Sequence, residues 1–182
     1  MAGEPLVLAS RSPQRRALLE QVGVKFQVRP ADVEELRDGV PREVVLENAR
    51  RKARAVEGAR VLGVDTAVVL DGEVIGKPRH SSEGEAFLRR LSGRLHEVMS
   101  GLVLREGESE REDVVVTGVR FRRLGDREVD WYLGTDEWRD RAGAYAIQGR
   151  GAALVDEMAG DYWNVVGLPL PALLRMAPDL VA

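Results

Sequence analysis

The chain has 182 residues, 44% of them hydrophobic, so it can bury a substantial core as one domain over residues 1–182, or as two small lobes sharing that core. Its 27 basic and 30 acidic residues nearly balance, which excludes the broad basic surface typical of proteins that bind duplex nucleic acid. The absence of cysteine excludes disulfides and thiolate catalysis, and without a signal-like or membrane-spanning apolar run we expect a cytoplasmic protein.

The first predicted elements are a short strand and a helix whose start suits an anion. Residues 6–9 form an apolar run too short for a helix, and Ser12 and Pro13 are typical of an N-cap and a first helical position. The helix is expected to continue to Val22. Backbone N–H groups at such a start attract anions, and Arg15 can add a guanidinium. An ordinary turn with solvated arginines is the alternative interpretation.

A second helix is expected after an acidic loop. A predicted strand at 24–28 leads into the loop at 30–39, and apolar spacing predicts a helix over 41–56. Lys52 lies beside the apolar stripe of this helix, close enough to reach whatever the helix packs against. Most lysines in such places extend from the edge of a surface helix into water. Asn48 falls on another face of the helix.

The most hydrophobic predicted strand carries a carboxylate in its middle. The strand is expected over 61–70, and the pair at 71–72 (Asp-Gly) predicts a tight hairpin into a short strand at 73–75. Asp65 interrupts the apolar run, and a buried carboxylate is costly unless it is hydrogen-bonded or lies beside a cation or metal. Asp65 is therefore the residue least easily explained by structure, although a cap on a loop is the alternative.

The second half of the chain is expected to alternate strands and helices. We expect a helix over 82–91 that starts with a capping box from Ser82 to Glu85, and a short helix capped by Asp126. The polar segment 105–113 is expected to be a mobile hairpin tip. The other predicted elements are strands at 96–104, 114–121 and 152–158, a glycine-rich segment at 142–151 whose backbone approaches a ligand or strand, a turn at 160–161 and a helix at 170–176.

Blocks of sequence along nearly the whole chain resemble those of the Maf family of nucleotide pyrophosphatases. The opening block is ASRSPQR, in which Gln14 stands where the family usually has arginine. The blocks that follow in family order are DVEE at 32–35, ARRKA at 49–53, GVDT at 63–66, GKP at 76–78, LSGRLH at 91–96, RAGAYAIQG at 141–149 and NVVGLP at 164–169. Arg141 replaces the family's lysine. Several blocks in the right order are far more specific than any one motif.

The resemblance implies both a fold and a reaction. The fold is α/β, with a mixed twisted sheet flanked by helices in two lobes around a central cleft, similar to inosine triphosphatases. The reaction is metal-dependent hydrolysis of a nucleoside triphosphate, such as dTTP or UTP, to a monophosphate and diphosphate, as house-cleaning of the nucleotide pool. We expect Mg²⁺ or Mn²⁺ as cofactor and a nucleoside triphosphate as ligand, without nucleic acid or membrane partners. A homodimer is plausible from the resemblance alone.

Site residues follow from the same resemblance. Asp65 is assigned as the catalytic carboxylate, either as general base or as the holder of the metal that activates water, with Lys52 beside it. Glu35 is the second expected metal ligand beside Asp65. Such a reaction needs cations that offset the charge of the phosphates. The residues assigned to the phosphates are Ser10, Ser12, Arg15, Lys52 and Lys77.

Three positions are associated with substrate choice in the family, and they correspond here to Gln14, Thr66 and Gln148. Thr66 and Gln148 fit the branch that prefers dTTP and UTP, and a glutamine amide can both donate and accept, as uracil and thymine require. Gln14 departs from that branch, since it removes a cation beside a polyanion. We expect weaker triphosphate binding, or compensation by Arg11 or Arg16.

Two alternatives remain at this point. A pyrophosphatase for modified nucleotides, such as 7-methyl-GTP or other non-canonical triphosphates, would keep the reaction and change the substrate. A non-enzymatic regulator of septum formation would keep only a binding role. The chain lacks the G-x-x-x-x-G-K-[ST] pattern of P-loop hydrolases, and its two histidines make a histidine-based metal site a poor explanation.

Overall fold

A seven-stranded mixed sheet forms the centre of the structure, a computed structural model that describes residues 5–181. The strands follow the order β2-β1-β3-β5-β6-β7, and β4 pairs with β3 off this path. β1 is parallel to β2 and β3, and the other pairs are antiparallel. The strands are β1 (Leu6–Leu8), β2 (Phe26–Val28), β3 (Arg60–Leu70), β4 (Glu73–Ile75), β5 (Leu95–Glu106), β6 (Ser109–Phe121) and β7 (Val155–Ala159).

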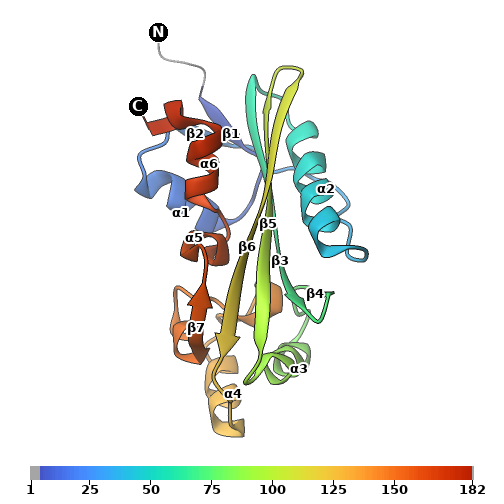
Figure 1. Cartoon of the computed structure of the whole chain (residues 1–182), viewed down its shortest axis with the longest axis vertical. Coiled ribbons are helices and arrows are strands. Elements are labelled where there is room, and N and C mark those ends of the chain that lie inside the picture. The colour runs from blue at the N-terminus through green and yellow to red at the C-terminus, as the bar shows by residue number, and fades with distance from the viewer. Residues whose placement is uncertain (1–4, 182) are drawn as a thin grey trace.

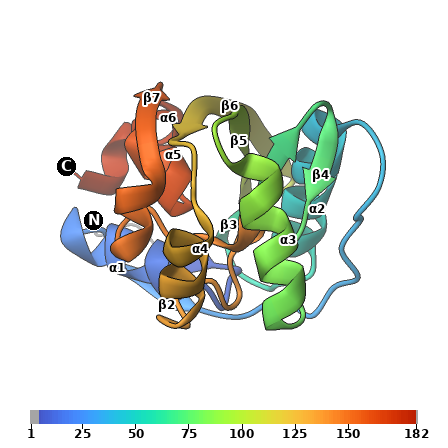
Figure 2. The same cartoon turned by 90° about the horizontal axis from the view of Figure 1, so that it is seen from below.

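Helices flank this sheet, which confirms the expected α/β class. Figure 1 shows α2 on one side of the long strands and α1, α5 and α6 on the other, with α3 and α4 at the lower end, nearest the viewer in Figure 2. Every helix within residues 5–181 is too short or too polar to span a bilayer. The helices are α1 (Pro13–Gln21), α2 (Pro41–Arg54), α3 (Ser81–Leu91), α4 (Asp126–Leu133), α5 (Tyr162–Val166) and α6 (Leu170–Met176).

Two hydrophobic clusters form most of the core, and the polar pair of β3 lies between them. One cluster joins β1, β3 and β5 to α1 and α6 and includes Val64. The other joins the lower parts of β3, β5 and β6 to α3 and α4 and includes Val68. Asp65 and Thr66 are therefore held in a strand that is anchored by apolar packing on both sides of them.

Two glycines allow α2 to lie directly on the sheet. A Cβ atom at Gly63 of β3 would come within 2.1 Å of the carbonyl oxygen of Ala49, and one at Gly101 of β5 within 2.5 Å of that of Val45. Any other residue would push the helix away from the strands, because the contacting atoms are helix backbone. This close approach brings the polar side chains of α2 to β3.

Several local predictions are confirmed. The Oγ of Ser12 accepts a hydrogen bond from the backbone N–H of Arg15, and Pro13 is the first residue of α1. Asp71 and Gly72 form the predicted tight turn between β3 and β4, both with positive φ, at 53° and 80°.

The predicted hairpin is confirmed, but its tip is much shorter than 105–113, because β5 runs to Glu106 and β6 begins at Ser109. Two of its glutamates form ion pairs at the surface. Glu110 and Glu112 each accept from an arginine of α2 at 2.6 Å, Arg54 and Arg50 respectively, and these hydrogen bonds lower the pKa of both carboxyls. These ion pairs between α2 and β6 stabilise strand structure where the sequence suggested a loop.

Three further predictions about element starts are wrong. Ser82 lies within α3, whose N-cap is His80, since the His80 ring accepts from the backbone N–H of Glu83. Gly125 is the N-cap of α4, and Asp126 is its first helical residue. The strand predicted over 152–158 begins only at Val155, because Arg150–Leu154 forms a 3-10 turn.

Candidate active site

The candidate site lies at an unpaired edge of β3. β1 pairs with β3 only at residues 61–62, and β4 pairs with it only at 68–70. Within residues 5–181, no strand covers this edge of β3 between those positions. The turn at 10–12, which leads from β1 into α1, begins where β1 stops. Thr66 therefore contacts α1, through Arg15, beyond the end of a parallel strand, the usual place for ligands in α/β folds.

One ammonium holds two carboxylates on the α2 side of the sheet. The Nζ of Lys52 lies 2.7 Å from Oδ1 of Asp65 and 2.6 Å from Oε1 of Glu35. The side chains of Lys52 and Asp65 are only 10% and 13% exposed, whereas Glu35 is 47% exposed. The partner charge offsets the cost of burying Asp65, which explains how an apolar strand tolerates a carboxylate.

Asn48 completes this cluster, and the sequence prediction missed it. Its Nδ2 donates to Oδ2 of Asp65 at 3.0 Å and to the carbonyl oxygen of Leu36 at 3.0 Å, and its Oδ1 accepts from the backbone N–H of Leu36 at 2.7 Å. Asn48 is 2% exposed rather than on an outer face of α2. Its position four residues before Lys52 was the available signal, because such residues share a helix face.

A second cluster lies on the opposite face of the sheet, because consecutive strand residues point to opposite sides. Asp65 faces α2, while Thr66 faces α1 and α5. The Arg15 guanidinium donates from Nη2 to Oγ1 of Thr66 at 3.0 Å, from Nη1 to Oγ of Ser10 at 3.0 Å and from Nε to the carbonyl oxygen of Gly167 at 2.8 Å. Burial lowers the pKa of Arg15, and the nearby carboxylates act in the other direction.

Hydroxyl groups order the turn that precedes α1. The Oγ of Ser10 accepts from the backbone N–H of Ser12 at 3.2 Å, and the Oγ of Ser12 donates to Oε1 of Gln14 at 3.1 Å. Arg11 is exposed, and Arg16 is exposed and paired with Glu20 at 2.8 Å. The structure thus brings the first predicted phosphate-binding residues together with Gln14 at one helix start.

The segment after α5 positions the carbonyl oxygen of Gly167, a role that the sequence prediction missed. Asn164 of α5 is fully buried, and its Nδ2 donates to the carbonyl oxygen of Val98 on β5 at 2.9 Å and to Oγ1 of Thr117 on β6 at 3.0 Å. These bonds fix α5 against the sheet just before Gly167. The NVVGLP block was the signal, although its residues had no assigned role.

Lys77 and Gln148 lie apart from these two clusters. Both side chains are exposed, and within residues 5–181 neither makes a hydrogen bond or ion pair with Asp65 or Arg15. The loop that carries Gln148 is held at its end, where the backbone N–H of Arg150 donates to Oε2 of Glu137 at 2.7 Å. The structure therefore leaves both residues on surface loops.

The donor set of the α2-side cluster suits a hard divalent cation. No group of three or more His, Cys, Asp or Glu side chains that could hold a metal occurs in the described part of the chain. Mg²⁺ commonly needs only one or two carboxylates, because water and substrate phosphates complete its shell. Asp65 and Glu35 fit this pattern, since both lie within hydrogen-bond distance of one nitrogen, the Nζ of Lys52.

His96 is buried and contacts the Tyr145 hydroxyl at 2.9 Å, as expected for a structural histidine.

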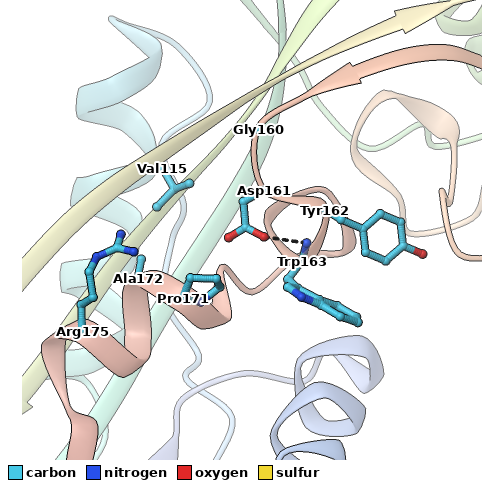
Figure 3. Close-up of a pocket in the computed structure, with 8 residues that line it drawn as sticks. All are labelled: Val115, Gly160, Asp161, Tyr162, Trp163, Pro171, Ala172 and Arg175. Carbon is cyan, nitrogen blue, oxygen red and sulfur yellow. Dashed lines mark hydrogen bonds between the residues drawn. The ribbon is translucent and has the colours of Figure 1, made fainter.

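Two hollows of the surface lie away from this site. One, of about 410 Å³, is shown in Figure 3, where Asp161 caps α5 by accepting from the backbone N–H of Trp163 at 2.9 Å. It is lined by Val115, Gly160, Asp161, Tyr162, Trp163, Pro171, Ala172 and Arg175. A second, of about 680 Å³, lies between the end of α2 and the tip of the β5–β6 hairpin. The candidate chemistry thus sits at a strand edge rather than in either hollow.

Comparison with known proteins gives matches along nearly the whole chain. The family model described as "Maf-like protein" matches residues 5–180. A protein of Anaeromyxobacter dehalogenans (strain 2CP-C) is 56% identical over 181 residues, which cover 94% of this chain and 93% of the relative. Proteins of Thermus thermophilus and Pyrococcus furiosus are 47% and 40% identical, each covering 94% of this chain and 92% and 93% of the relative. All three relatives are named dTTP/UTP pyrophosphatase.

Proposed function

The chain belongs to the family of Maf-like proteins, and on that premise we propose that it hydrolyses dTTP and UTP. One water molecule is consumed, the bond between the α and β phosphates breaks, and the products are the nucleoside monophosphate and inorganic diphosphate. The names of relatives up to 56% identical over nearly the whole chain support this activity. The structural observation that carries it is the pair of carboxylates gathered on Lys52, both close enough to Arg15 of α1 to oppose the lowering of its pKa by burial.

The start of α1 is proposed to hold the phosphates. Ser10 and Ser12 offer hydroxyl groups there, and the helix dipole favours negative charge. Three N–H groups of Arg15 donate to the protein, and its guanidinium has more N–H groups than these bonds use. Lys52 and Lys77 would add positive charge, and the exposed Lys77 would have to move toward the substrate.

Asp65 is proposed to act on the attacking water. Both its oxygens accept hydrogen bonds, one from Lys52 and one from Asn48, so the carboxylate is oriented before substrate binds. With Glu35 it would hold Mg²⁺ or Mn²⁺, which when bound polarises a phosphoryl oxygen and lowers the pKa of its bound water. Lys52 would offset the negative charge that develops on the phosphates.

Recognition of the base is proposed to involve Thr66, Gln148 and Gln14. Thr66 is fixed by Arg15 and by the Oγ of Ser100, which lies 2.8 Å from its Oγ1. The exposed amide of Gln148 is free to read the donor and acceptor pattern of uracil or thymine. Several other features remain predictions. They are a single functional unit over residues 1–182, a homodimer, a cytoplasmic location, the lack of nucleic acid partners and a cleft between two lobes.

A panel of nucleotides tests this proposal. The protein is incubated with dTTP, UTP, the other canonical triphosphates, 7-methyl-GTP and ITP, in Mg²⁺, Mn²⁺ or chelator, and the products are separated by ion exchange. We expect diphosphate and monophosphate from dTTP and UTP, and none with chelator. Orthophosphate and nucleoside diphosphate as products would contradict the proposed bond cleavage. Faster hydrolysis of 7-methyl-GTP or ITP would contradict the proposed substrate, and no hydrolysis at all would favour a binding role.

A further inference from the structure

The contacts of Asn48 allow only one orientation of its side-chain amide. The backbone N–H of Leu36 needs an acceptor and its carbonyl needs a donor, so Oδ1 must face the former and Nδ2 the latter. The remaining N–H of Nδ2 then points to Oδ2 of Asp65. One buried amide therefore ties the backbone of the acidic loop to the carboxylate of β3.

The acidic loop depends on such a restraint. Residues 29–37 belong to no helix or strand, and the side chain of Glu35 is 47% exposed. The ion pair between Glu35 and Lys52 is open to water, where salt and side-chain motion weaken it. The amide contacts of Asn48 are neutral and 2% exposed, and they hold the residue next to Glu35. If Lys52 turns toward a phosphate, these contacts still keep the two carboxylates together.

We infer that Asn48 is a positioning residue that holds Glu35 close to Asp65 and thereby sets the affinity of this carboxylate pair for a divalent cation. The inference rests on the proposed function insofar as that function makes the pair a metal site. Replacing a residue that hydrogen-bonds to a metal ligand commonly weakens metal binding by about 10- to 100-fold. Asn48 donates to one carboxylate and anchors the backbone beside the other.

Two variants remove this restraint, and a third provides the control. Asn48→Ala deletes all three contacts, and Asn48→Ser leaves one hydroxyl that cannot make them together. Arg51→Ala is the matched control, because Arg51 also joins α2 to the loop, from its Nη1 to the carbonyl oxygen of Glu34 at 2.9 Å, without touching Asp65. A double variant with Asp65→Asn tests whether the effect of Asn48 passes through the carboxylate pair.

The measurement is Mn²⁺ binding to the full chain without nucleotide, by titration calorimetry and electron paramagnetic resonance, with urea unfolding of each variant. We expect Asn48→Ala and Asn48→Ser to weaken Mn²⁺ binding by about tenfold or more. Arg51→Ala should stay within about twofold of wild type, since its bond to the loop is exposed to water and restrains it weakly, and Asp65 is untouched. In the Asp65→Asn background, loss of Asn48 should weaken Mn²⁺ binding little further.

Wild-type affinity in either folded Asn48 variant would overturn the inference, as would an equal loss in Arg51→Ala. Absence of Mn²⁺ binding by the wild type would also overturn it. Hydrolysis of dTTP is assayed separately on the same samples. Inactivity of the wild type together with the expected pattern of Mn²⁺ binding would contradict the proposed function and leave the role of Asn48 supported.

Discussion

Replacing Arg15 by lysine keeps a positive charge at the start of α1 but removes the planar guanidinium group. The guanidinium donates in three directions, to Ser10, Thr66 and the carbonyl oxygen of Gly167, over distances of 2.8–3.0 Å. A single ammonium cannot span all three, so Arg15→Lys should keep about one of these bonds. Hydrogen bonds to charged groups contribute about 1.5–3 kcal/mol each.

Two of the acceptors have other partners, which reduces the expected loss. Thr66 keeps its contact with Ser100, and Ser10 still accepts from the backbone N–H of Ser12. We therefore expect Arg15→Lys to lower the free energy of unfolding by about 3 kcal/mol, toward the low end of two lost bonds. For a chain of this size, that corresponds to a fall in Tm of about 6–12 °C.

Urea unfolding and calorimetry measure this difference. Arg16→Lys is the matched control, because Arg16 lies on the same helix, is exposed and pairs only with Glu20. It should change the free energy of unfolding by no more than about 0.5 kcal/mol. A decrease in the free energy of unfolding below about 1 kcal/mol in Arg15→Lys would show that the guanidinium does not join α1, β3 and the segment after α5.

Three further predictions concern the sheet, a buried histidine and the substrate. Gly63→Ala should lower the free energy of unfolding by about 2–3 kcal/mol in urea, because the new methyl group meets the backbone of α2; an unchanged midpoint would contradict the close packing. Burial lowers the pKa of His96 from 6.5 to about 4. As pH falls, the unfolded chain therefore binds a proton at a higher pH than the folded chain, so the stabilisation linked to His96 is present above pH 6.5 and is lost toward pH 4. Between pH 6.5 and 5 the free energy of unfolding should fall by about 2 kcal/mol more in wild type than in His96→Phe, and equal slopes would refute this. Gln14→Arg adds a cation at the start of α1 and should lower the KM for dTTP several-fold with little change in kcat, whereas an unchanged KM would contradict a contribution of position 14 to phosphate binding.

Much of the fold could be predicted from the sequence where a local signal and the tertiary structure agree. Ser12 and Pro13 start α1 as predicted, and Asp71-Gly72 turns β3 into β4. The long hairpin of β5 and β6 could not be predicted in full, because its charged residues are stabilised by α2, more than fifty residues earlier. Single-sequence patterns do not report such distant ion pairs.

The candidate site shows the same division. A carboxylate inside an apolar strand indicated that Asp65 needs a partner, and the structure supplies Lys52 and Asn48. The role of Asn48 required the path of the acidic loop, and the role of the carbonyl oxygen of Gly167 required the packing of α5. Backbone atoms and residues that act through loops carry little signal in sequence, because their chemistry depends on placement rather than on residue type.

Release of diphosphate from dTTP by wild type and by Asp65→Asn tests directly whether Asp65 carries the hydrolysis. The variant should remain folded, because Lys52 keeps its contact with Glu35, and urea unfolding checks this. The control is Glu157→Gln, the same chemical change on the exposed side of β7, which should leave activity unchanged. We expect metal-dependent diphosphate release by wild type and control, and loss of at least about a hundredfold in Asp65→Asn. Wild-type rates in a folded Asp65→Asn would contradict it.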